Sequence, residues 1–338
     1  MRLHNFPAPG LSRRSRTAIA ILGATWRPFT FLVPTNRAGI VASRALFRGT
    51  LALVSRPVSG STFDRVEQAG SAGGIVRGEW VRTPGTTRDD GAILHLHGSA
   101  YVLCSSRTHR GLTSHLGAAT GLPVFSIDYR LSPSHRYPAA SQDVRAAWDW
   151  LLAEGYDPAR IVIVGDSAGG QLAISLALEL ARTGEPLPAA LVTLSPVIDL
   201  SLRSAIVRDR IEYDPFAPAS VARRMLEQYA DADAQQDEGL RIGFDDIEDF
   251  PPTLVHCGSR EMLAADCTEL ARRIRGAGFL VEHRSWPGQM HVFQALTALM
   301  PESREALEEI RAFVDAHMPA ASVQTQPKRT RLSLAAGA

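Results

Sequence analysis

A serine stands in a glycine-rich segment where it could act as a nucleophile. Residues 165–170 read Gly-Asp-Ser-Ala-Gly-Gly, which places Ser167 at the centre of a G-x-S-x-G pattern. An apolar run precedes this segment, and leucines at helical spacing follow it. A strand that turns sharply into a helix lifts the hydroxyl above the sheet edge and directs backbone amides at developing negative charge. Gly165 and Gly169 leave room in such a turn, because they have no side chains to clash. The pattern predicts Ser167 as the nucleophile of an acyl-transfer reaction.

A serine hydroxyl is a weak nucleophile until a base within hydrogen-bond reach takes its proton. Of the ten histidines, only His291 lies in a loop containing glycine and proline after the last expected strand. His256 and His283 fall within expected strands, and His317 falls near the end of an expected helix, so structural roles explain them. We therefore predict His291 as the general base.

Two carboxylates compete for the third position, the acid that orients the histidine. Glu261 falls in the loop directly after the strand expected at 253–257, where it could reach across the sheet edge to the imidazole. Asp266 falls in the first turn of the following helix, where a favourable interaction with the helix dipole accounts for it. Position favours Glu261, and Asp266 is the alternative.

The oxyanion of a tetrahedral intermediate needs preorganised amide donors. His97, Gly98, Ser99 and Ala100 follow an expected strand and precede a helix. We assign the oxyanion hole to Gly98, Ser99, Ala100 and Ala168, with the amides of the last three as donors. His97 is expected to anchor this loop and not to act as an acid or base.

Taken together, these segments resemble the bacterial hormone-sensitive-lipase-like esterases, also called family IV lipolytic enzymes. The resemblance covers residues 90–300. It rests on segments that occur in a characteristic order, namely His97-Gly98-Ser99-Ala100, Asp128-Tyr129-Arg130-Leu131, Tyr137-Pro138-Ala139-Ala140, Gly165 to Gly170, and Met290-His291-Val292-Phe293. The resemblance implies an α/β-hydrolase fold with a mainly parallel eight-stranded sheet and a helical cap. It also implies hydrolysis of short-chain acyl esters through an acyl-enzyme, without a metal or organic cofactor.

Two departures from the family pattern concern the site. The family usually has three glycines after the histidine, whereas Ser99 and Ala100 replace two of them here. The family acid is usually an aspartate followed by Pro-Leu, and 261–263 read Glu-Met-Leu in that position. A glutamate is therefore expected to serve in place of the aspartate.

From Gly73 onward the chain alternates short apolar runs with helical segments, which is typical of an α/β fold with a parallel sheet. The expected strands cover 76–82, 92–96, 123–127, 160–165, 190–194, 253–257 and 281–285. The expected helices cover 12–25, 37–54, 109–120, 140–154, 170–182, 219–230, 263–277 and 303–317. We divide the chain into a cap segment at 1–60, a catalytic domain at 61–318 with a further cap contribution from 203–250, and a disordered tail at 319–338.

Composition limits the partners. A formal net charge of +1 over 338 residues argues against a nucleic-acid partner, which would need a concentrated basic field. Three cysteines without metal-ligand spacing indicate a reducing, cytoplasmic setting and no structural metal. No apolar stretch is long enough for a spanning helix. Arg13 and Arg14 before an apolar run resemble a twin-arginine export signal, but Arg27 and Pro28 interrupt that run. We expect instead an N-terminal helix pair that packs on the body or touches a membrane surface.

The predicted function is a serine carboxylic ester hydrolase with a small-molecule ester as substrate. An amidase or N-acetyl hydrolase would use the same residues and stays an alternative. Ligand-binding proteins of this fold that lack catalysis lose the histidine, whereas His291 is present here. The sequence leaves a homodimer open.

Overall fold

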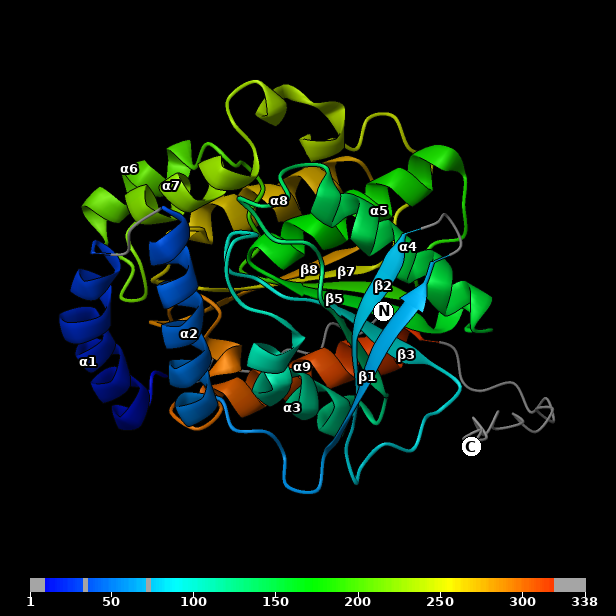
Figure 1. The fold of residues 1–338 in the computed structure, drawn as a ribbon, viewed down its shortest axis with the longest axis horizontal. Coiled ribbons are helices and arrows are strands. Elements are labelled where there is room, and N and C mark those ends of the chain that lie inside the picture. Colours follow the sequence, from blue (N-terminus) through cyan, green and yellow to red (C-terminus); the bar gives the residue numbers. More distant parts are fainter. Residues whose placement is uncertain (1–9, 33–35, 71–73, 319–338) are drawn as a thin grey trace, which may run out of the picture.

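The computed structural model describes residues 10–32, 36–70 and 74–318, and the tail expected to be disordered at 319–338 lies outside them. An eight-stranded sheet forms its centre (Figure 1). The strand order is β1-β2-β4-β3-β5-β6-β7-β8. The pairs β1/β2 and β2/β4 are antiparallel and all others are parallel. The strands are β1 (Thr62–Ala69), β2 (Ile75–Arg82), β3 (Ala92–Leu96), β4 (Val124–Ile127), β5 (Ile161–Asp166), β6 (Ala190–Leu194), β7 (Thr253–Gly258) and β8 (Val281–Trp286). The expected fold class is confirmed.

Nine α-helices occur within the described part of the chain. They are α1 (Arg13–Thr30), α2 (Arg37–Val54), α3 (Arg110–Thr120), α4 (Ala139–Ala153), α5 (Ala168–Thr183), α6 (Arg203–Ile211), α7 (Ala219–Tyr229), α8 (Ala264–Gly276) and α9 (Glu302–His317). Seven of the strands and eight of these helices were expected. The two exceptions are β1, which is mostly exposed and has three charged residues among its eight, and α6, which is short and rich in arginine.

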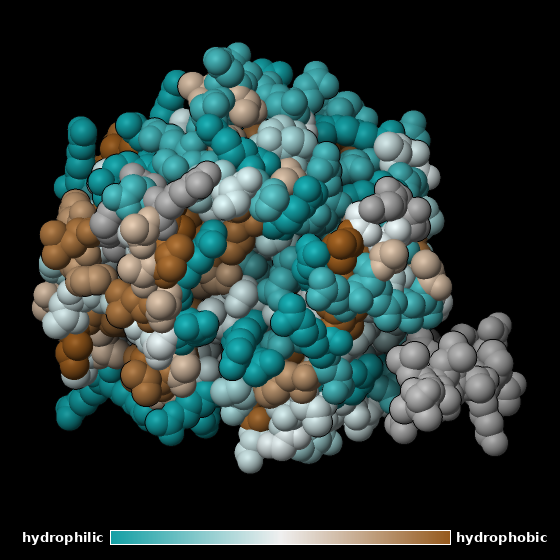
Figure 2. All heavy atoms as spheres, in the orientation of Figure 1, coloured by the Kyte–Doolittle hydropathy of each residue, from teal (hydrophilic) through white to brown (hydrophobic). Residues whose placement is uncertain are grey.

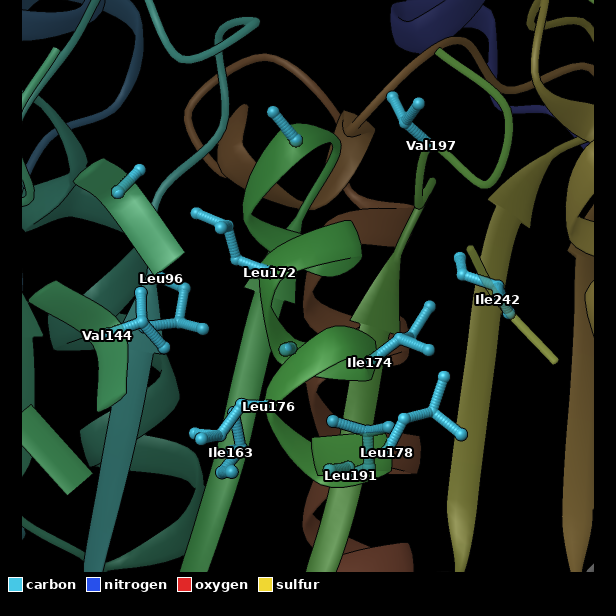
Figure 3. Close-up of a cluster of buried hydrophobic side chains, with 14 of the residues drawn as sticks. Leu96, Val144, Ile163, Leu172, Ile174, Leu176, Leu178, Leu191, Val197 and Ile242 are labelled. Carbon is cyan, nitrogen blue, oxygen red and sulfur yellow. The ribbon is translucent and has the colours of Figure 1, made fainter. Parts of the chain in front are cut away.

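Helices cover both faces of the sheet, and alternate strand residues point to opposite sides. Ile161 and Ile163 of β5 pack in the cluster that includes α4, α5 and α8, whereas Val162 and Val164 pack in the cluster that includes α3 and α9. Figure 3 shows the first of these clusters, in which α5 lies over the sheet. Strands β3 to β7 are buried on both faces, as expected of a parallel sheet. Because helices cover both faces, the loops at the carboxyl ends of the parallel strands are left to carry the candidate site.

The N-terminal helices α1 and α2 stand at one end of the molecule, next to α6 and α7 (Figure 1). Arg27 of α1 connects the two pairs. Its guanidinium donates to the backbone carbonyl of Asp214 at 2.8 Å and forms an ion pair with Asp209 at 3.0 Å. Arg44 of α2 donates to the carbonyl of Val102 at 2.9 Å, which ties this helix to the loop after β3. None of the described helices combines the length and the apolar character that crossing a membrane requires.

Candidate active site

Ser167 occupies a tight turn between the end of β5 and the start of α5. Its backbone has φ 53° and ψ −116°, a conformation that L-residues rarely adopt. A Cβ on Gly169 would overlap the carbonyl oxygen of Leu96, and one on Gly165 would overlap the carbonyl oxygen of Gly169. The two glycines are therefore required by close backbone approach, as the sequence predicted. The turn presents the serine hydroxyl at the carboxyl edge of the parallel strands.

His291 lies in the loop after β8, where the sequence placed it. Its Nε2 is 3.0 Å from the Oγ of Ser167, which is a hydrogen-bonding distance. Burial lowers the pKa of the imidazole, but the nearby carboxylate of Glu261 and the charge of Asp214 outweigh it, so that the pKa is raised. The histidine can therefore accept the serine proton and hold it as an imidazolium.

Glu261 is fully buried beside His291. Its Oε1 lies 3.8 Å from Nδ1 of His291, beyond a normal hydrogen bond. Within the described residues, neither of these two atoms has a hydrogen-bond partner. Contacts of this kind are often long in the free enzyme and shorten when substrate binds. Oε2 is held firmly, because it accepts from the Ser195 hydroxyl at 2.7 Å and from the Gly258 amide at 3.0 Å.

Asp266, the alternative acid, lies in the first turn of α8. The side chain is buried, and its Oδ2 is without a hydrogen-bond partner in the described part of the chain. Burial, followed by the charge of Asp199, raises its pKa to about 7. The structure brings Glu261 and not Asp266 to the imidazole.

Two side chains at the site were not predicted from the sequence. Ser195 follows β6 directly and bridges the two loops, since its hydroxyl donates to Glu261 and accepts from the Val292 amide at 3.2 Å. Its position after a buried strand, at the same sheet edge as Ser167, is a signal that could have identified it. Asp214 lies between α6 and α7, and no sequence pattern connects it to this place.

The oxyanion loop after β3 has an unusual backbone. Ser99, Ala100 and Tyr101 have φ of 79°, 56° and 61°, in the left-handed region that favours glycine. This geometry explains why glycines are usual at the first two positions. The amide of Gly98 donates to Oδ2 of Asp166 at 3.0 Å, so that Gly98 shapes the loop and its amide is not free to bind an oxyanion. The amides of Ser99 and Ala100, with that of Ala168, stay as the expected donors.

His97 anchors this loop, as expected. It is buried and stacks on Tyr129 with ring centroids 4.2 Å apart. The Tyr129 hydroxyl donates to the His97 carbonyl at 2.6 Å. Burial lowers the pKa of His97 to about 3, so the imidazole is neutral. Its Nδ1 contacts the Gly98 carbonyl and the Tyr129 hydroxyl, and within the described residues no hydrogen bond joins the ring to Ser167.

A cavity of about 180 Å³ opens onto the Ser167 hydroxyl and His291. Its lining is largely apolar and comes from α1, α2, α7 and the loops at the sheet edge. The large apolar side chains in this lining, which could contact an acyl chain, include Leu22, Trp26, Phe47, Leu51, Phe216 and Met225. A wider groove of about 2120 Å³, lined by charged residues of α4, α5 and 231–246, does not include the serine.

A strained serine on a strand-to-helix turn, a histidine on the last loop and a buried acid after β7 define a site of the α/β-hydrolase fold. A family model described as alpha/beta hydrolase fold matches residues 93–295. The carboxylesterase/phospholipase LipF of Mycobacterium tuberculosis is 38% identical over 243 residues, which cover 69% of this chain and 65% of LipF. The acetyl-hydrolase of Streptomyces hygroscopicus is 37% identical over 70% of this chain and 78% of its own.

A solved structure of an esterase from the bacterial hormone-sensitive lipase family superposes with a TM-score of 0.80 at 32% identity. The match covers 92% of this chain and all of that chain. The chain therefore belongs to the hormone-sensitive-lipase-like family of α/β hydrolases. The match spans slightly less than two thirds of the length of LipF.

Proposed function

We propose that this protein is a serine carboxylic ester hydrolase that acts on short-chain acyl esters. The contact of 3.0 Å between Ser167 Oγ and His291 Nε2, at the mouth of an apolar cavity, carries this proposal. Relatives named carboxylesterase, esterase and ethyl acetate hydrolase support ester over amide substrates.

The reaction follows from the geometry. His291 takes the proton of Ser167 as the hydroxyl attacks the ester carbonyl, and the amides of Ser99, Ala100 and Ala168 bind the oxyanion. The imidazolium, stabilised by Glu261, then protonates the leaving alcohol. Water attacks the acyl-enzyme in the same way and releases the acid. None of these steps calls for a metal or an organic cofactor.

Glu261 is the acid in this proposal, and three neighbours position it. Ser195 binds its carboxylate, as described above. Asp214 accepts from the amide of Met262 at 3.0 Å, and Arg208 of α6 donates to the carbonyl of Glu261 at 2.9 Å. The insertion at 203–250 thereby supports the acid loop from outside the sheet.

We propose that α1, α2, α6 and α7 together form the cap over the acyl pocket. The shared lining of the cavity by α1, α2 and α7 supports this assignment. A cavity of about 180 Å³ favours acyl chains shorter than about eight carbons. We place the enzyme in the cytoplasm, on the ground that its three cysteines are free and buried.

A series of p-nitrophenyl esters of increasing acyl length tests the proposal. We expect kcat/KM to be greatest for acyl chains between acetyl and about hexanoyl and to fall beyond them. Ser167→Ala should lower kcat by on the order of a millionfold, while the thermal unfolding profile stays unchanged. Activity that rises steadily to palmitoyl esters would contradict the short-chain assignment, and residual turnover above about a tenth of wild type in Ser167→Ala would contradict the nucleophile.

A further inference from the structure

The outer face of α1 and α2 is apolar and exposed. Leu32 and Leu53 retain 73% and 69% of their accessible surface, and Figure 2 shows apolar side chains gathered over these two helices. Surface helices normally expose polar residues. The exposed stripe of α2 runs at helical spacing and contains Ala38, Val41, Ala42, Ala45, Leu46, Ala52 and Leu53. A contiguous patch of this kind marks an interaction surface.

The charge of the same segment is one-sided. Residues 1–60 contain nine arginines and no lysine, aspartate or glutamate, whereas 61–338 contain 27 basic and 35 acidic residues. The exposed arginines of the helix pair include Arg13, Arg16 and Arg48. Within the described residues, none of these three forms an ion pair. Arg13 and Arg16 lie in the first turns of α1, at the end of the hairpin where α2 finishes (Figure 1).

We propose that the outer face of α1 and α2 docks on an anionic lipid bilayer. Leucine, isoleucine and phenylalanine side chains would enter the region between headgroups and acyl chains, and the arginines would contact lipid phosphates. The net negative body, at 61–338, is repelled by the same surface, so a single orientation is favoured. A second copy of this face is a poor partner, because two segments with nine arginines each would oppose one another.

The inner face of the same helices gives this docking a consequence. Leu22 and Trp26 of α1 and Phe47 and Leu51 of α2 line the cavity at Ser167. The helix pair is therefore one layer between the bilayer and the acyl pocket. Docking places the pocket where amphiphilic esters concentrate. Binding itself requires no turnover, so it is testable separately from the proposed hydrolysis.

Vesicle flotation tests the proposal, with the full chain carrying Ser167→Ala to remove turnover. The probes are vesicles of phosphatidylcholine alone and of phosphatidylcholine mixed with phosphatidylglycerol. We expect binding to the mixed vesicles, about tenfold weaker binding to phosphatidylcholine alone, and loss of binding at high salt. Equal or absent binding to both vesicles at low salt would overturn the proposal.

Two sets of variants separate the charge from the apolar face. Arg13→Gln and Arg48→Gln together should reduce the partition coefficient by about tenfold or more. A matched control on distant exposed arginines, at Arg241 and Arg275, should leave it unchanged. Equal losses in the control and in the test set would show that only the overall charge acts, and would overturn the proposal.

For the apolar face, Leu46→Gln with Leu53→Gln should reduce binding about tenfold or more, since two large apolar side chains are lost from the interface. Ile75→Gln, at an exposed apolar residue of β2, is the matched control and should bind as the parent does. Thermal unfolding verifies that each variant is folded. If light scattering shows a dimer that the leucine variants convert to monomers, the face binds a second copy and the proposal is wrong.

Discussion

The carboxylate of Asp214 accepts a hydrogen bond of 3.0 Å from the backbone amide of Met262, the residue that follows Glu261. Its second oxygen accepts from the amide of Phe216 at 2.8 Å. Asp214 is fully buried, and burial raises its pKa to about 7. Arg27 of α1 binds the Asp214 carbonyl, so one residue connects the N-terminal helices to the loop of the proposed acid. The position of Glu261 thus depends on segments far from it in sequence.

Asp214→Asn should lower kcat by about tenfold and leave KM for a short ester nearly unchanged. An asparagine accepts through one oxygen only, so one of the two backbone amides loses its partner inside the protein, at a cost of about 1–3 kcal/mol. The loop of Glu261 would then relax away from His291. The measurement is steady-state kinetics on p-nitrophenyl butyrate. Asp237→Asn, an exposed aspartate that also accepts two hydrogen bonds, is the control; equal kinetics in both variants would contradict the positioning role.

The two carboxylates after β7 should behave differently when neutralised. Glu261→Gln should lower kcat by several orders of magnitude with little change in substrate binding, because the imidazolium loses its stabilising charge. Asp266→Asn should keep near-normal turnover, since Asp266 does not face the imidazole. Both variants are measured on the same short ester. A dead Asp266→Asn enzyme beside a near-normal Glu261→Gln enzyme would transfer the role to Asp266.

The rate should depend on pH through His291. The imidazole must be neutral to accept the serine proton, and its pKa is raised above the usual value because Glu261 and Asp214 outweigh the effect of burial. We therefore expect kcat/KM to increase with pH and to reach half of its maximum above about pH 6.5. Residual activity of Glu261→Gln should reach its half-maximum at a lower pH, because the negative charge is gone. An unchanged midpoint in that variant would argue against contact between the two groups.

Asp266 should affect stability in a pH-dependent way. Burial raises its pKa to about 7, so its neutral form is favoured in the folded protein. The stability that the protonated Asp266 carboxyl contributes is fully present below the pKa of an aspartate in the unfolded chain, near 4. It is lost as the pH rises through about 7. The unfolding free energy of wild type relative to Asp266→Asn should therefore decline over this range. Urea unfolding at several pH values measures it, and a constant difference would show that the carboxyl is not buried as described.

The sequence by itself determined the local parts of the site. The G-x-S-x-G turn between an apolar strand and a helix predicted Ser167 as the nucleophile, and the close backbone approaches at 165 and 169 explain the two glycines. The loops after the last two strands predicted His291 as the base and Glu261, ahead of Asp266, as the acid, because the carboxyl ends of parallel strands meet at one edge. These inferences depend on short-range periodicity and turn chemistry, which are encoded within a few residues.

Only the tertiary structure decided how distant segments act on that site. Asp214 and Arg208 belong to an irregular insertion, and their contacts with the acid loop depend on how α6 packs beside α8, which no periodicity encodes. The sequence favoured Glu261 over Asp266 by position alone, and the folded loop is what places Glu261, and not Asp266, beside the imidazole. The hydrogen bond from the amide of Gly98 to Asp166 likewise depends on the fold, which brings these two residues together. Hydrogen bonds between residues far apart in sequence depend on the packed arrangement of the chain. For this reason the sequence predicted the reacting groups but not the residues that hold them in position.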